Sequence, residues 1–465
     1  MTALHPVSTG SGPRPRERTT PTAPAFALLG TVQVTLIFTL AAISVPLPRI
    51  GREFALAQSD LILLSAAYGL TLASLLLFGG RLADRYGGRP VFTAGLVLFA
   101  AASVVVPLAP GYAVLLGARF GQGAGAALVA PAAMAVLRTV FPEPAAYGRA
   151  MATWGGLNML GATAGNLLAG VATALWSWRA ALAVPVLVAA AALALAPRVL
   201  PATTPSPSRS GSRRPGLDLP GALLVTAGVT LASYGLVMSD PYGWTAPGVL
   251  VPLLAGALLL AAFLAVELKV RDPLLPPRFL RDGRRAAGLL AVAVTAAGAS
   301  VTFVALSLQL QESRGWSALE TSAVFVPFAA AQLAAGRAAG PMVARIGAAR
   351  TTATGLAVAA VGLALIALTG LNEQLPYAYG LLPGTLLLPA GAAVAFAGAA
   401  VLATDRVPAA QAGLAGGVFN TAMELGASVV FAATLSLGGD VGSFGVLAAG
   451  FTALALVNFL AMKRR

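Results

Sequence analysis

Apolar runs of about 20 residues or more recur along the whole chain and constrain its fold more than any other feature. A helix of that length rises ~1.5 Å per residue and so crosses the ~30 Å hydrocarbon core of a bilayer. Only 10% of the residues are charged, whereas a soluble protein of this size carries roughly a quarter. The pattern predicts an all-α integral membrane protein.

The apolar runs divide into fourteen expected membrane spans. An even number of spans places both termini on the same side of the membrane. The expected spans are 25–48, 61–80, 91–110, 112–137, 150–173, 180–200, 219–239, 247–268, 286–311, 318–340, 352–371, 377–403, 412–436 and 441–462.

The positive residues orient these spans. With both termini inside, 25 of the 30 Lys and Arg residues fall in inner segments, and only Arg49, Arg52, Arg179 and Arg314 lie outside. Cytoplasmic loops carry such an excess of positive charge, which also explains the net charge of +14 without any nucleic-acid partner. The abundance of alanine and arginine is typical of GC-rich bacterial genomes. We therefore expect a multi-pass protein of the bacterial cell (inner) membrane, with both termini cytoplasmic.

Two polar connectors divide the spans into groups of six, two and six. Residues 1–24 are expected to form a disordered cytoplasmic tail, because they contain prolines and arginines but no apolar core. Residues 201–218 form a Pro/Ser/Arg-rich linker and residues 269–285 a basic connector. The expected units are a six-helix bundle at 25–200, two additional helices at 219–268, and a second six-helix bundle at 286–465.

The two six-helix groups resemble each other. The connector "GGRLADRYGGRP" at 79–90 and "AGPMVARIGAAR" at 339–350 share two glycines and an arginine at an offset of 260 residues. Pro142 and Pro408 match at an offset of 266. Paired repeats of this kind build the alternating-access machinery of many secondary transporters.

Several chemistries are excluded by composition. The chain has no cysteine, and its one histidine, His5, lies in the N-terminal tail, so thiol or histidine catalysis and a metal site are not expected. Lys269 and Lys463 lie outside any phosphate-binding loop pattern, which argues against an ATP-driven pump. A membrane enzyme or sensor would need a nucleophile, a metal site or a sizeable soluble domain, and the sequence offers none of these.

At the inner connector after the second span, the residues resemble the loop signature of the major facilitator superfamily. The region "LLGARFGQGAGAA" at 115–127 is similar to that superfamily's fourth-helix motif, and the fourteen-span layout is similar to its drug:proton antiporter branch. The segments 218–229, 273–281 and 412–426 are also similar to segments of that branch. The loop signature is carried by Gly80, Leu82, Ala83, Asp84, Arg85, Gly87 and Arg89, and the helix motif by Arg119, Gln122, Gly123 and Gly125.

Two departures from the family pattern affect the expected mechanism. The fifth-helix antiporter motif reads "GATAGNLLAG" at 161–170, which keeps Gly161, Gly165 and Gly170 but replaces the usual proline by Asn166. We expect a straighter helix there. The three glycines are expected to form a helix-packing motif, with small residues 161, 165 and 169 forming a close-packing seam. The acid that the first helix of this branch often carries is replaced by Thr39, so the usual proton carrier is missing.

Glu424 is the one acidic residue near the middle of an expected span. A charge at mid-membrane costs about 2.5–3.5 kcal/mol, so burial favours the neutral acid. A carboxyl whose access to water changes with conformation can bind a proton on one side and release it on the other. Asn420 lies one turn earlier on the same helix face and is expected to hydrogen-bond the protonated acid. The structural alternative is a permanently protonated glutamate that bonds two helices together.

Four further polar side chains are candidates for the proton or substrate cavity. Arg119 is the cation that lies deepest within an expected span, and Gln122 lies one turn away. Asn158 and Asn166 lie on the fifth span. For each of these residues, hydrogen bonding between helices is the alternative, and the family resemblance favours a place near the transport path for Arg119.

Asp84 lies among arginines at the inner end of the second span, with Arg85 and Arg89 nearby. An aspartate there can accept hydrogen bonds from a helix N-terminus in the other half, and the family resemblance implies that this contact closes the cytoplasmic side. Arg138 is the expected charge partner. Ala344 stands at the equivalent position of the second copy, so we expect an asymmetric gate.

The sequence thus predicts a major facilitator fold of two pseudo-symmetric six-helix bundles plus two central helices. The expected function is proton-driven export of small hydrophobic molecules such as drugs or antibiotics. No cofactor is expected, because the proton gradient supplies the energy, and the protein is expected to be a monomer. Uptake or facilitated diffusion of a metabolite by the same fold is the alternative.

Overall fold

The computed structural model describes residues 22–202, 216–270, 273–312, 315–316, 318–370, 375–405, 407–408, 411–436 and 450. Thirteen helices of 18 residues or more fill most of the described part, together with short helices at the turns. The tail before residue 22, most of the linker and nearly all of the expected span 441–462 lie outside these residues. The described fold is helical throughout, as the sequence predicts.

The long helices follow the chain in the expected order, each beginning or ending within a few residues of an expected span. They are α1 (Thr22–Ala41), α3 (Gln58–Tyr86), α4 (Gly88–Leu108), α5 (Tyr112–Val140), α6 (Pro144–Leu175), α7 (Trp178–Val199), α8 (Leu219–Tyr242), α9 (Pro247–Glu267), α11 (Gly283–Glu312), α12 (Ala318–Ile346), α13 (Ala348–Leu365), α15 (Leu382–Thr404) and α16 (Ala412–Ser436). The short ones are α2 (Leu47–Glu53), α10 (Pro277–Arg281), the π-helical turn Ile366–Gly370 and α14 (Tyr377–Gly380).

Two expected spans are divided in the structure: 377–403 is interrupted at Leu381 between α14 and α15, and the first span is divided more widely. The first span was expected at 25–48, but α1 ends at Ala41 and a turn leads into the separate helix α2. Leu47 begins α2, and Pro46 directly precedes it, a place where the fixed φ of proline suits the start of a helix. The expected span therefore joined two helices because their apolar residues are continuous in sequence.

Nine helices in the described part are long and apolar enough to cross a membrane. α9 shows the surface consequence, because Val251, Leu254 and Leu258 are each more than 60% exposed. An apolar patch of that kind is costly in water but matches a lipid environment. These helices bear out a membrane protein, whereas the count of fourteen spans goes beyond them.

The packing of the helices repeats between the two bundles. In the first bundle, α5 packs against α3 and α4, and α1 against α6; in the second, α15 packs against α12 and α13, and α11 against α16. Gly87 ends α3 with φ +94°, and Gly347 ends α12 with φ +82°. Only glycine adopts that backbone conformation readily, so the connector repeat seen in sequence corresponds to a repeated turn.

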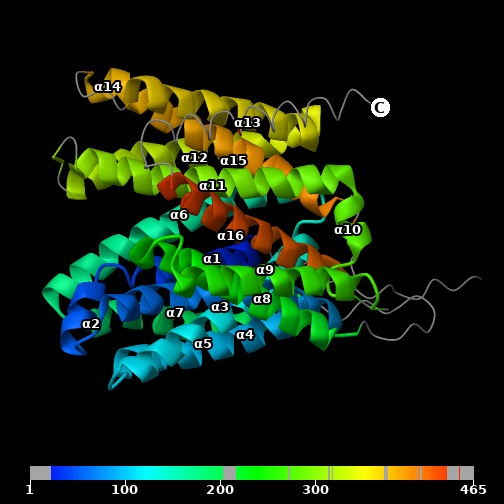
Figure 1. Cartoon of the computed structure of the whole chain (residues 1–465). Coiled ribbons are helices and arrows are strands. Elements are labelled where there is room, and N and C mark those ends of the chain that lie inside the picture. Colours follow the sequence, from blue (N-terminus) through cyan, green and yellow to red (C-terminus); the bar gives the residue numbers. More distant parts are fainter. Residues whose placement is uncertain are drawn as a thin grey trace, which may run out of the picture.

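Two symmetric contacts join the bundles. α16 packs against α3 and α5, and α6 packs in the same manner against α12 and α15. α8 and α9 pack against each other, and α8 also packs against α3 of the first bundle. Figure 1 shows α16 between the lower group of helices, α1 to α9, and the upper group, α11 to α15.

Candidate functional site

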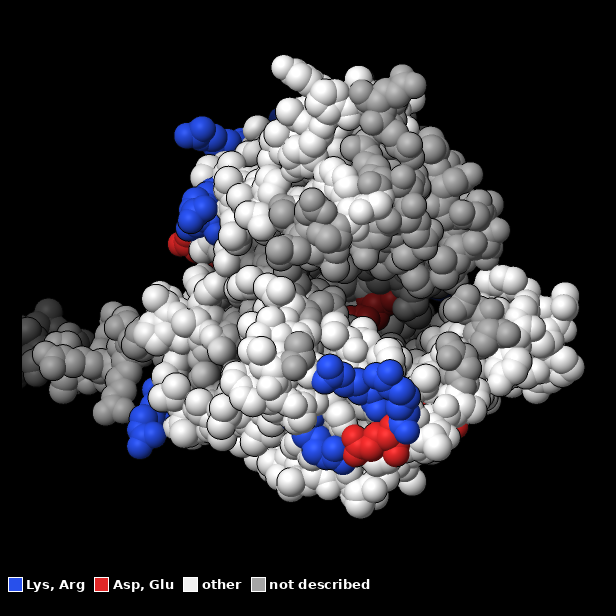
Figure 2. All heavy atoms as spheres, turned by 90° about the vertical axis from the view of Figure 1, so that its left-hand side faces the viewer, with Lys and Arg blue, Asp and Glu red and all other residues white. Residues whose placement is uncertain are grey.

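The molecule is hollowed on the face where α2 and α14 lie, which we call the open face. Figure 2 shows this hollow with Asp or Glu atoms deep inside it. α16 runs from the opposite end of the molecule toward the open face (Figure 1). α16 therefore extends from the end opposite the open face toward the hollow.

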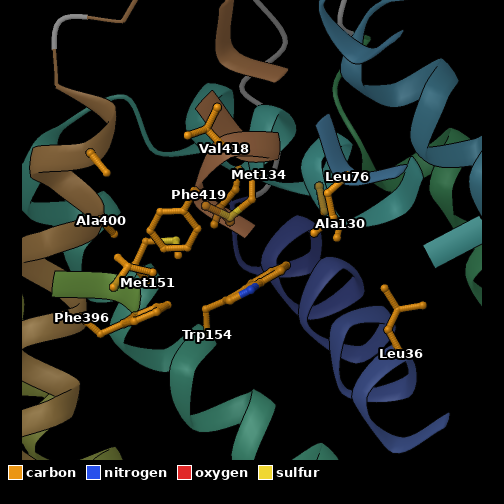
Figure 3. Packing of buried hydrophobic residues seen from close by; sticks show 14 of the residues in the cluster. Leu36, Leu76, Ala130, Met134, Met151, Trp154, Phe396, Ala400, Val418 and Phe419 are labelled. Carbon is orange, nitrogen blue, oxygen red and sulfur yellow. The ribbon is translucent and has the colours of Figure 1, made fainter. Parts of the chain in front are cut away.

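An apolar plug fills the space between the two bundles. Phe396 and Phe419 meet edge to face with ring centroids 5.5 Å apart, and Trp154 is 2% exposed. Figure 3 shows these rings together with small and aliphatic residues from both bundles. The labelled members of the plug are Leu36 of α1, Leu76 of α3, Ala130 and Met134 of α5, Met151 and Trp154 of α6, Phe396 and Ala400 of α15, and Val418 and Phe419 of α16.

Glu424 lies on α16 one to two turns beyond the plug. Its side chain is half-buried, and no hydrogen bond or ion pair to another side chain is recorded for it among the described contacts. The helix places it 11 residues beyond Gly413, about 16 Å along the axis. The plug therefore separates the carboxyl from the end opposite the open face, while the side chain remains partly accessible to solvent.

Two of the three asparagines that the sequence singles out, Asn420 and Asn158, have other partners than Glu424. Asn420 is 4% exposed and donates to the Gly416 carbonyl of its own helix at 2.8 Å, so the expected bond to Glu424 is wrong for this conformation. Asn158 accepts from the Gln33 amide at 2.8 Å and lies 4.0 Å from the Met423 sulfur. The side chain of Asn166 lies outside the described residues.

Arg119 is fully buried in the first bundle. Its Nη1 donates to the Thr39 carbonyl at 2.9 Å and to Gln122 Oε1 at 3.1 Å. Gln122 in turn donates to the Ser103 hydroxyl at 2.9 Å. The position where the family often has an acid thus lies directly beside this cation. With Thr39 there, Nε and Nη2 of Arg119 have no hydrogen-bond partner.

Tyr68 of α3 lies beside Arg119, and sequence reasoning missed it. Its ring centroid lies 5.1 Å from the Arg119 guanidinium carbon, a cation–π distance, and its hydroxyl donates to the Leu36 carbonyl at 3.0 Å. It lies within electrostatic range of Glu424 as well. Arg119 of α5 and Tyr68 of α3 therefore meet inside the first bundle.

Other polar residues of the interior were also missed. Gln33 of α1 is 4% exposed, and Gln332 of α12 and Thr421 of α16 each have a buried side-chain oxygen without a partner. All three lie well inside long helices. A search for every polar side chain within a span, rather than for charged ones alone, would have found them.

At the end opposite the open face, Asp84 joins the two bundles. Its carboxylate accepts from the backbone N–H of Gly413 at 2.5 Å and of Leu414 at 2.7 Å. These are among the first N–H groups of α16, which have no partner within the helix and lie at its positive end. Arg81 lies within electrostatic range of Asp84. We call this closed end the gate end.

Gly80 permits the close contact at the gate end. A Cβ at this position would lie 2.4 Å from the Gly413 carbonyl oxygen and 3.2 Å from Gly417 Cα. Because backbone atoms cannot rotate away as a side chain does, only glycine allows α3 and α16 to meet here.

We expect Gly80→Ala to keep the gate end from closing, since α16 must move away from the new methyl group. Overpacking of this kind costs about 1–3 kcal/mol, and the melting temperature of the purified protein measures the effect. Gly170→Ala is the control, because the nearest atom to a Cβ at Gly170, Val45 Cγ1, lies at 3.8 Å. Equal melting temperatures for the two variants would contradict a close contact between α3 and α16 at Gly80.

Two further residues of the loop signature, Arg89 and Arg85, make contacts at the end of the first bundle. Arg89 donates to the Pro197 carbonyl at 2.9 Å, which ties the start of α4 to the end of α7. The Arg85 guanidinium lies 5.6 Å from the ring centroid of Tyr86. These contacts stay within one bundle, unlike that of Asp84.

Arg138 does not pair with Asp84 as the sequence analysis expected. It lies at the end of α5, where Nη2 donates to the Thr404 carbonyl of α15 at 3.5 Å and the guanidinium stacks 4.9 Å from the Tyr147 ring centroid. The expected pairing assumed that opposite charges at one membrane face would meet. The helix positions instead direct Arg138 toward the second bundle.

Two of the three glycines of the packing motif form a close seam with α1. A Cβ at Gly161 would lie 2.7 Å from the Val34 carbonyl oxygen, and one at Gly165 would lie 2.8 Å from that of Phe38. Ala169 continues the seam and is fully buried. Gly170 lies off it, so its expected packing role is wrong.

Comparison with known proteins agrees with this arrangement. Residues 27–276 and 288–465 match the Major Facilitator Superfamily. The chain is 36% identical over 425 residues to the cephamycin export protein of Amycolatopsis lactamdurans, a match that covers 91% of this chain and 86% of that protein. It is 35% identical over 405 residues to a puromycin resistance protein of Streptomyces alboniger, covering 85% and 78%.

A solved structure shares the fold. The human organic anion transporter MFSD10 superposes with a TM-score of 0.63 over 96% of this chain and 100% of that chain, at 18% sequence identity. Together with the family match and the relatives, these findings confirm the family resemblance at the level of the superfamily. The chain belongs to the Major Facilitator Superfamily, as a multi-pass membrane transporter, not an enzyme, that is related to drug and antibiotic efflux proteins.

Proposed function

We propose that the protein is a proton-coupled exporter of small hydrophobic molecules that works by alternating access. One observation carries the proposal: the half-buried carboxyl of Glu424 lies between an apolar plug and a hollow open face, while Asp84 ties the gate end shut. Ionisable residues at such depth are costly and are retained chiefly where they serve a function. The described conformation is then the outward-facing state.

The placement of Glu424 supports proton coupling. When the hollow faces outside, the carboxyl takes a proton from the external medium; when the gate end opens, it releases that proton to the cytoplasm. Asn158, Asn166, Asn420, Gln122 and Arg119 are the further polar groups that we assign to the proton or substrate path. Tyr68 joins them because its ring lies beside the Arg119 guanidinium.

Hydrophobic molecules are the substrate class that the interior suits best. The residues that precede Glu424 on α16, Ala422 and Met423, are apolar and half-buried, and the plug contributes three aromatic rings. Binding sites for small molecules are mostly apolar with a few placed polar groups. The names of the relatives, cephamycin export and puromycin resistance, support antibiotics as substrates and export as the direction.

The topology that we propose has fourteen spans, six at 25–200, two at 219–268 and six at 286–465. The excess of Lys and Arg in the segments at the gate end assigns that end to the cytoplasm. Both termini are then cytoplasmic, in the inner membrane of a bacterium. One chain contains both bundles, so the monomer suffices for transport.

A drug-susceptibility experiment tests the function. We expect a strain that overexpresses the protein to tolerate at least one lipophilic antibiotic or dye, and the corresponding deletion strain to be more sensitive. An uncoupler that collapses the proton gradient should remove the difference. Resistance that survives the uncoupler would contradict proton coupling, and energised accumulation of the compound would show uptake instead of export.

A further inference from the structure

Two helix C-termini converge at the gate end. α5 ends at Val140 and α15 ends at Thr404. The offset of 266 residues between the two bundles makes Arg138 of α5 the equivalent of Thr404 of α15, and in the structure these equivalent residues meet, with Arg138 Nη2 3.5 Å from the Thr404 carbonyl oxygen. Each helix C-terminus carries about half a negative charge. Closing the gate end therefore brings two like partial charges together.

Arg138 is held at this meeting point by a buried aromatic residue of its own bundle. Tyr147 of α6 is 1% exposed, and its ring lies under the guanidinium with 4.9 Å between centroid and carbon. The helix that carries Tyr147, α6, also packs against α15. α15 thus receives one contact from α5 and others from α6.

The same contacts surround the turn between α15 and α16. Arg138, Tyr147 and Thr404 line a pocket with Val407 of that turn and Ala412 at the start of α16. Asp84 lies at the far end of the turn, where it binds the first N–H groups of α16. The turn is therefore contacted at both ends by the first bundle.

The signs of the contacts are complementary. The negative end of α15 meets the cation Arg138, and the positive end of α16 meets the anion Asp84. Arg138 and Asp84 cannot exchange their roles, because each has a charge opposite to that of the helix end which it contacts. Both must separate when the bundles rock apart at the cytoplasmic side.

We propose that Arg138, positioned by Tyr147, is a second latch of the cytoplasmic gate, which grips the end of α15 while Asp84 grips the start of α16. This inference rests on the proposed alternating-access function, since a latch matters only if the gate end opens. It gives Arg138 an interbundle role through a helix terminus rather than through an ion pair.

Cysteine labelling tests the latch directly. The chain has no cysteine, so Ala415→Cys introduces a single reactive thiol on α16; Ala415 is 3% exposed and lines the same pocket. In inside-out membrane vesicles without added substrate, N-ethylmaleimide reaches this thiol only when the gate end opens. We expect Arg138→Gln to raise the labelling rate about fivefold, the size typical of a partly buried charge at a helix end.

Matched variants separate a latch from a general loss of structure. Arg285 of α11 donates to the Asp405 carbonyl at 3.3 Å, so it contacts the same turn but from within the second bundle. Arg285→Gln should leave the labelling rate within about twofold of the parent. Arg138→Lys keeps the charge and should label more slowly than Arg138→Gln.

A second variant tests the same prediction in case Arg138→Gln fails to reach the membrane. Tyr147→Leu removes the ring under the guanidinium and should raise labelling about threefold. Unchanged labelling in Arg138→Gln or Tyr147→Leu would overturn the proposal, as would an equal rise in Arg285→Gln. Because labelling needs no substrate, failure of the drug-resistance experiment with normal labelling results would overturn the exporter function and leave the latch standing.

Discussion

Glu424→Gln is expected to abolish efflux, with drug tolerance falling to that of cells that lack the protein. Glutamine has nearly the same size and hydrogen-bonding reach as a protonated glutamate but cannot bind or release a proton. Because Glu424 is the one acidic residue near the middle of a long helix in the described part of the chain, no other described carboxyl can take over. We expect proton-driven dye efflux from energised vesicles to slow by at least about a hundredfold, the scale of a missing proton-transfer group.

The matched control is Glu143→Gln. Glu143 is an exposed acid at the start of α6, where its side chain makes no capping hydrogen bond, so its loss should leave efflux unchanged. Equal amounts of both variants in the membrane exclude a folding defect. Full drug tolerance in Glu424→Gln would remove this residue from the mechanism and favour the structural alternative, a permanently protonated helix contact.

Asp84→Ala is expected to shift the resting conformation from outward-facing to inward-facing. The substitution removes two hydrogen bonds from a charged acceptor, to Gly413 and Leu414. Such hydrogen bonds contribute about 1.5–3 kcal/mol each. When the gate end is open, hydrogen bonds to water recover part of this free energy. A net loss of about 2 kcal/mol shifts the two populations about 30-fold. Labelling of Ala415→Cys from the cytoplasmic side measures the shift.

Asp84→Asn serves as the graded comparison, because its amide oxygen retains one acceptor without the charge. We expect it to label at a rate between those of the parent and Asp84→Ala. The Arg138→Gln substitution combined with Asp84→Ala should label faster than either variant alone. A cytoplasmic labelling rate in Asp84→Ala equal to that of the parent would contradict the gate assignment.

The sequence predicted the helices well because length and hydropathy act locally. A run of apolar residues forms a long helix wherever it lies in the chain. Gly87 and Gly347 each end a helix because the backbone at these positions has a positive φ, which glycine adopts readily. The division of the first expected span into α1 and α2 was not predicted. Apolar residues continue through that turn, so hydropathy alone gives no boundary there.

The candidate site was predictable only in part. Glu424, Arg119 and Asp84 stand out because charge is rare in such a chain, and rarity can be seen without coordinates. Tyr68 could not be selected in this way, since one tyrosine within an apolar helix has no distinguishing pattern. Its place became evident only in the structure, where the Arg119 guanidinium of α5 lies over its ring.

By itself, the sequence determined that this protein lies in a membrane, that it consists of two related helical bundles, and which acid stands alone within a helix. These properties follow from composition, spacing and repetition, which are independent of how distant segments meet. The tertiary structure decided the partners: Asn420 bonds its own helix, Arg138 meets α15 instead of Asp84, and Gly170 lies off the seam. Side-chain partners depend on the rotation and crossing of helices far apart in sequence, and those are set by the packing of all the helices together.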